Sequence, residues 1–113
     1  MPNYEVNRAA VAQARKLIDR GTYDDHTEWS DAAPSAADGN KAIEEQGWDG
    51  FAAWHLAVDP DKGENTKGRY RFPYGDFSKV HRCAVISLES RAAQNDHDDI
   101  TKSTKNLLGL IDS

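Results

Sequence analysis

The feature that most constrains this chain is a change of sequence rhythm near its centre, in RYRFPYGDFSKVHRCAVISLESRAAQ (residues 69–94). Basic and aromatic side chains alternate first, which predicts a strand over Arg69–Phe72 with the rings of Tyr70 and Phe72 on one face. Pro73 then removes a backbone donor, so the strand has to stop there or lie at a sheet edge.

The rhythm becomes helical after the turn that Gly75 and Asp76 supply. Apolar residues then recur every four positions, at Val80, Ala84, Leu88 and Ala92. This spacing predicts the longest helix of the protein, from Phe77 to Gln94, with Asp76 as its N-cap.

Two further helices are predicted before this segment. One runs from Val6 to Arg20, with Asn7 as N-cap and a glycine after its end. Thr22–Ala33 reads as an acidic, polar connector whose aromatic rings pack on the body. A second, short helix begins at Ser35, where Ser35 and Asp38 resemble a capping box, and ends at Gly47.

The segment Gly47–Val58 predicts a helical turn that passes into a strand near Leu56, pairing antiparallel with Arg69–Phe72. A last helix, capped by Asp96 and Asp99, has an apolar stripe at Ile100, Thr104, Leu107, Leu108 and Ile111. The predicted class is therefore mainly α, with four to five helices in a compact bundle and at most one short two-stranded β-ribbon.

Length and composition predict one globular domain over residues 1–113, because 113 residues with 38% hydrophobic content suffice for a single core. One cysteine cannot form an internal disulfide, and the chain has neither a signal-peptide pattern nor a long apolar run. A cytoplasmic location away from membranes is expected. No dinucleotide, phosphate-loop or zinc spacing occurs, so neither a cofactor nor a metal is predicted.

The charge is uneven along the chain. Lys62–Arg82 holds six cationic and two acidic residues, a balance of +4, although the whole chain carries −5. The predicted binding residues of this stretch are Arg69, Arg71, Tyr74, Lys79 and Arg82, which would grip a phosphate or an acidic surface and stack on bases. The competing interpretation places the aromatic rings of this stretch in the core and its cationic side chains at the solvated edge of that core.

Candidates for catalysis are few. His81 and Cys83 are two residues apart, so on a helix they point in different directions and do not exchange a proton. Cys83 is expected to be a small core residue, His81 a partly exposed polar contact and His55 a hydrogen-bonded structural histidine.

The chain resembles an uncharacterised family of small bacterial proteins through NRAAVAQARKLID, DDHTEWSDAAPSA, AAWHLAVD, RYRFPYGDFSKVHR and SRAAQNDHDDI. Its second half, from GWDG to RAAQ, also resembles a module at the C-terminal ends of phage prohead proteases and other phage-related proteins. The resemblance implies a shared fold and a phage-derived or stress-related setting. It implies no catalytic activity, since no protease domain is present.

These observations favour a small non-enzymatic interaction module that binds a protein partner or a second copy of itself. One alternative is a nucleic-acid or phosphate-binding protein that uses the basic and aromatic stretch 69–82. A second alternative is a small enzyme of unknown class.

Overall fold

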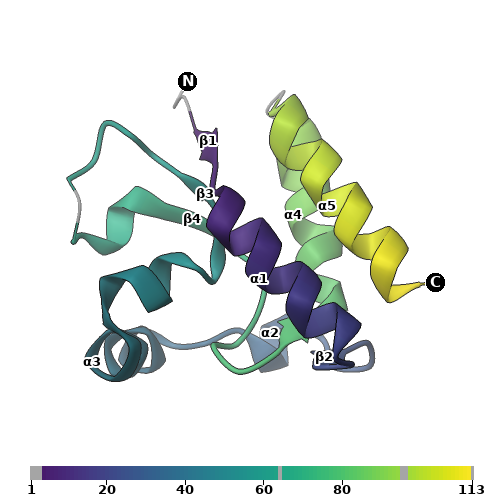
Figure 1. The fold of residues 1–113 in the computed structure, drawn as a ribbon, viewed down its shortest axis with the longest axis horizontal. Helices are drawn as coiled ribbons and strands as arrows, with labels where there is room; N and C mark the ends of the chain where they lie inside the picture. Colours follow the sequence, from purple (N-terminus) through teal and green to yellow (C-terminus); the bar gives the residue numbers. More distant parts are fainter. Residues whose placement is uncertain (1–3, 64, 95–96, 113) are drawn as a thin grey trace.

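The computed structural model describes residues 4–63, 65–94 and 97–112 (Figure 1). The elements, in chain order, are β1 (Glu5–Val6), α1 (Arg8–Asp19), β2 (Tyr23–Asp24), α2 (Trp29–Ala32), α3 (Ala36–Ala52), β3 (His55–Val58), the 3₁₀ turn η1 (Lys67–Arg69), β4 (Tyr70–Pro73), β5 (Val80–His81), α4 (Arg82–Gln94) and α5 (Asp98–Ile111). The mainly α class is confirmed.

The helices surround a small amount of sheet. Figure 1 shows α4 and α5 side by side, with α1 crossing in front between them and the strands, and with α3 on the other side. β1, β3 and β4 form an antiparallel sheet in that order, and β2 pairs in parallel with β5. The predicted pairing of the strand near Leu56 with the Tyr70 strand is confirmed, with Ala57 opposite Arg71. The strand content exceeds the predicted ribbon, because β1, β2 and β5 pair across long sequence distances.

The first helix is shorter than predicted. α1 begins at Arg8, and Val6 belongs to β1. The Asn7 side chain does not cap the helix; its Nδ2 donates to the Ala52 carbonyl oxygen at 2.9 Å and so ties α1 to the end of α3. The predicted stop is present, since Gly21 has φ 76° and the amides after the helix return to the last turn.

α3 joins two predicted elements. Its capping box is formed, with the Asp38 amide donating to the Ser35 hydroxyl and the Ser35 amide to the Asp38 carboxylate. Gly47, at φ 75°, kinks the helix where the sequence predicted its end, and helical backbone resumes up to Ala52. The helix buries Ala42 and Phe51, whereas Ile43 is only half-buried.

The central segment differs from the prediction at its corner. Arg69 lies in η1 rather than in the strand, and α4 begins at Arg82, five residues after Phe77. With 13 residues α4 is shorter than α3 and α5, so the prediction of the longest helix here is wrong. Asp76 binds the amides of Ser78 and Lys79, so it caps a turn and not a helix. Val80 and the residue after it are extended and pair with β2.

The predicted apolar stripes are confirmed as core. Val80, Ala84, Val85, Leu88 and Ala92 are buried in or before α4, and Ile100, Thr104, Leu107 and Ile111 are buried in α5. Leu108, also predicted in the α5 stripe, is half-buried and packs against this core. α5 packs on both α4 and α1. The capping role predicted for Asp96 falls outside the described residues. Among the described helices, none has the length and apolar character needed to cross a membrane.

The aromatic rings of the corner take up separate positions. Tyr70 lies near Trp48 and Phe51, whereas the rings of Phe72 and Tyr4 meet in an edge-to-face arrangement. Phe72 and Phe77 both have positive φ, 62° and 69°, which is unusual for bulky residues. This backbone breaks the two-residue alternation that the strand prediction assumed.

Gly75 is the tightest point of the corner. A Cβ there would lie 2.7 Å from the Trp54 ring and closer still to the Lys79 carbonyl oxygen. We expect Gly75→Ala to lower the free energy of unfolding by about 2 kcal/mol, because neither neighbour is free to move away. Urea denaturation measures this change. Gly109→Ala in α5, with no atom within 4 Å of its Cβ, is the control and should stabilise by about 0.5–1 kcal/mol. Equal effects of the two substitutions would contradict the packing described.

Candidate functional site

Two of the five predicted binding residues lie in different parts of the fold. The Arg71 guanidinium lies 5.9 Å from the centroid of the Tyr4 ring, next to β1. Arg82 binds Asp112, just beyond α5, through two hydrogen bonds of 2.8 and 3.1 Å. Figure 1 shows β1 and the C-terminal end of α5 well apart. These two guanidinium groups therefore do not form one cluster.

Of the other three predicted residues, Arg69 and Tyr74 have side chains that bind nearby backbone carbonyl oxygens. Arg69 donates to a backbone carbonyl oxygen of the preceding loop at 2.8 Å. Lys79 is partly buried, and it binds Asp76 through its backbone amide rather than its ammonium. Tyr74 is completely buried, and its hydroxyl donates at 2.8 Å to a backbone carbonyl oxygen after α3. The Tyr74 ring is therefore part of the core, where burial raises the pKa of its hydroxyl.

A groove of about 480 Å³ lies along α1 and reaches α5. Its lining residues are Val6, Arg8, Val11, Ala12, Arg15, Lys16, Asp19 and Ser103. Three cations and one acid give this groove a local charge of +2 in a chain whose formal net charge is −5. Apolar side chains line part of it, so the groove combines a basic rim with an apolar floor.

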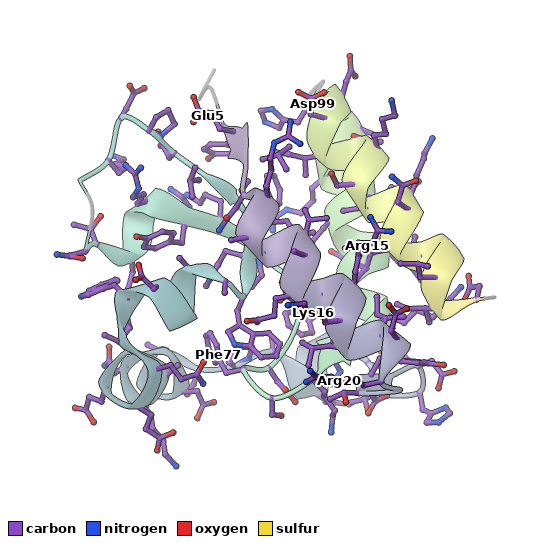
Figure 2. The ribbon with its side chains drawn as sticks, viewed as in Figure 1. Glu5, Arg15, Lys16, Arg20, Phe77 and Asp99 are labelled. Carbon is purple, nitrogen blue, oxygen red and sulfur yellow. The ribbon has the colours of Figure 1, made fainter. Side chains whose placement is uncertain are left out.

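The cations of the groove are available for binding. Arg8, Arg15 and Lys16 are exposed and make no ion pair or side-chain hydrogen bond with any other residue that the structure describes. Figure 2 shows Arg15 on the side of α1 that faces α5, with Lys16 and Arg20 further along the helix. The sequence analysis missed this surface. The sequence signal for it was the pair Arg8 and Arg15, which are seven residues apart and therefore lie on one face of a helix.

The most connected side chain of the corner is Asp76. Its Oδ1 accepts from the Ser78 amide, the Ser78 hydroxyl and the Lys79 amide at 3.0, 2.7 and 2.9 Å. Its Oδ2 lies 2.9 Å from His81 Nε2. Burial alone would raise the pKa of the Asp76 carboxyl, but these hydrogen bonds outweigh it and lower the pKa to about 2.

His81 is enclosed, which corrects the prediction of a partly exposed residue. It is 2% exposed, and its Nδ1 has no hydrogen-bond partner. Its ring lies 5.7 Å from that of Trp29. The histidine became buried because β5 places it between the Asp76 turn and α2, not on a helix surface.

This cluster is not arranged as a nucleophilic relay. A serine relay needs the imidazole between hydroxyl and carboxylate, but here the Ser78 hydroxyl donates to Asp76 and not to His81. Cys83 is half-buried, and burial raises the pKa of its thiol, which opposes thiolate formation. In the described part of the chain, no three His, Cys, Asp or Glu side chains gather in an arrangement that would hold a metal ion.

The acidic connector is organised by Asp24. Its carboxylate accepts from the amides of His26 and Thr27 and from the Thr27 hydroxyl, at 2.8, 2.9 and 2.7 Å. These hydrogen bonds lower the pKa of the Asp24 carboxyl well below its usual range. The carboxylate is thus used in shaping the loop.

The comparisons with known proteins add no relative from which a site could be transferred. No family model matches the chain, and neither the curated proteins nor the solved structures searched contain a significant match.

The Asp76 cluster predicts a specific stability loss. In Asp76→Asn, the amide oxygen can keep the Ser78 and Lys79 bonds, but the NH₂ group would face His81 Nε2. His81 would then need its proton on Nδ1, which is enclosed without an acceptor. We expect about 2 kcal/mol lower free energy of unfolding in urea at neutral pH. The control Asp112→Asn breaks an exposed ion pair and should cost less than about 1 kcal/mol. Similar losses in both variants would contradict the role of the buried pair.

His55 predicts a pH dependence in a separate range. Burial lowers its pKa to about 4, and the hydrogen bond to the Phe51 carbonyl oxygen only partly offsets this. His55 therefore takes up a proton near pH 6.5 in the unfolded chain but only near pH 4 in the folded chain, so neutral His55 contributes to the free energy of unfolding. The contribution is therefore complete above pH 6.5 and is lost as the pH falls from 6.5 to 4, to a total of about 3 kcal/mol. Urea midpoints measured across this range should fall less steeply in His55→Phe. Parallel pH profiles would show that another group is responsible.

Proposed function

We propose that this protein is a non-enzymatic interaction module that binds an acidic, amphipathic segment of a partner protein in the groove along α1. The observation that carries the proposal is that Arg8, Arg15 and Lys16, beside apolar side chains, have no ion-pair partner among the described residues. An arginine guanidinium binds a carboxylate through two parallel hydrogen bonds, so carboxylates of a partner fit this rim.

The length of α1 suits a helical segment as the partner. α1 has 12 residues, a length of roughly 18 Å or about three turns. A partner helix of similar length would lay apolar residues at i, i+3 and i+4 on Val6, Val11 and Ala12 and direct its acidic residues to the rim. The net charge of −5 on the whole chain would repel a long polyanion, which ranks nucleic acid below an acidic protein segment.

The proposed setting is the cytoplasm of a bacterium, in a phage-derived or stress-related context. The motif resemblance supports this setting, and the single cysteine fits a reducing compartment.

The proposal is tested with a fluorescent amphipathic peptide that carries Leu and Glu at helical spacing, titrated with the full chain. We expect saturable binding that weakens as salt increases, because the rim contacts are exposed ion pairs. The double variant Arg15→Glu/Lys16→Glu should raise the Kd by at least about tenfold, a loss of about 1.4 kcal/mol. Lys102→Glu/Lys105→Glu, on the exposed side of α5, changes the charge equally and should leave the Kd within about twofold.

Three outcomes would overturn the proposal. The first is no saturable binding of the peptide, and the second is an equal loss in both double variants. The third is preferential binding of a single-stranded oligonucleotide, which would replace the acidic segment with a nucleic acid. The mass in solution is measured in parallel. A dimer that Arg15→Glu/Lys16→Glu dissociates would show that the groove binds a second copy instead of a separate partner.

A further inference from the structure

A second pocket, of about 230 Å³, lies between the first turns of α3 and the strands β3 and β4. It shares no lining residue with the groove along α1. Phe51 and Phe77 form an aromatic wall, with ring centroids 5.6 Å apart and planes 25° apart, and Pro73 extends it. Figure 2 shows Phe77 beside α3. An aromatic ring fits such a wall by stacking or edge contacts.

His55 supplies an unused acceptor in this pocket. The residue is 6% exposed, and its Nδ1 lies 2.8 Å from the Phe51 carbonyl oxygen. A carbonyl oxygen only accepts, so Nδ1 carries the proton and the neutral ring presents Nε2 as an acceptor. Nε2 makes no hydrogen bond to any described residue. His81 Nδ1 is sealed in the core, but His55 lines a pocket that a ligand can enter.

Lys67 provides the charge at the rim. It is exposed, and its ammonium donates at 3.1 Å to the Ala36 carbonyl oxygen, which uses one of its three donors. No other charged side chain lines this pocket within the described residues. The ammonium lies over Gly39, since a Cβ on Gly39 would be 3.5 Å from both Lys67 Nζ and the Phe51 ring.

We propose that this pocket binds a small aromatic carboxylate that also carries a hydroxyl or N–H donor. The ring packs against Phe51 and Phe77, the donor bonds to His55 Nε2, and the carboxylate pairs with Lys67. The volume is below the about 300–1,000 Å³ of sites for drug-sized ligands, so the ligand has one ring. The inference does not depend on the groove along α1, and each site can fail while the other stands.

The probe is 4-hydroxybenzoate, titrated into the full chain and followed by amide chemical shifts. Benzoate lacks the donor for His55, and phenol lacks the carboxylate for Lys67. We expect saturable binding of 4-hydroxybenzoate, with both matched probes weaker by at least about fivefold because each loses one polar contact. Lys67→Met should weaken 4-hydroxybenzoate and benzoate but leave phenol unchanged.

Gly39→Ala separates ligand binding from folding. A methyl group at this position enters the pocket at ordinary contact distance, so it fills ligand space without a clash. We expect an unchanged or higher Tm, because alanine favours the helix, together with a rise of at least about tenfold in the Kd for 4-hydroxybenzoate. Gly109→Ala is the matched control, with the same substitution in a helix and no neighbour within 4 Å, and it should leave the Kd unchanged.

The proposal is overturned if 4-hydroxybenzoate does not saturate the protein, or if its Kd is the same in Gly39→Ala as in Gly109→Ala. Phenol binding as tightly as 4-hydroxybenzoate would remove the assigned role of Lys67 and with it the carboxylate class of ligand.

Discussion

The arrangement of the chain depends most on the hydrogen bonds that the Asp76 carboxylate accepts. One of its oxygens accepts three hydrogen bonds from Ser78 and Lys79, and the other binds His81, all within a turn of a few residues. That turn reverses the chain after β4 and brings Val80 and His81 into line with β2, next to α2. The Asp76 side chain therefore holds the turn that leads into β5 and the start of α4. An acceptor-only group with a low pKa suits this role, because it remains ionised while donors converge on it.

The apolar stripes of the long helices could be predicted from sequence because a period near four is a local property. The four-residue spacing predicted that Leu88 in α4 and Leu107 in α5 belong to the core, and both side chains are buried. The start of α4 could not be predicted in the same way. Val80 and Ala84 keep a four-residue spacing although the first lies in a strand and the second in a helix. The strand assignment depends on pairing with Tyr23, 57 positions earlier, and no local pattern reports that contact.

The candidate site was harder to predict than the fold because charge counted along a sequence does not reveal which charges are neutralised in space. The cations of residues 62–82 looked like a cluster, but Arg82 is paired with Asp112 and Arg69 with a backbone carbonyl oxygen. Arg8, Arg15 and Lys16 on α1 have no side-chain partner among the described residues, although no binding site was predicted on that helix. Arg8 and Arg15 were identifiable as one helix face. That their side of α1 would remain uncovered depended on where α5 packs, which the sequence does not encode locally.

Both proposed sites lie on elements that are joined by hydrogen bonds, namely α1 and the end of α3. Asn7, at the start of α1, binds the last turn of α3, and Gln13 in α1 donates to the Tyr74 hydroxyl at 3.1 Å and to Ala53 at 3.4 Å. Tyr74 in turn stacks on Trp54, with ring centroids 5.3 Å apart. These partly buried hydrogen bonds and the ring contact tie α1 to the end of α3 and to Tyr74. The groove along α1 and the pocket at His55 are therefore preformed. Because a preformed site loses little conformational freedom on binding, small ligands and short segments can be held by few contacts.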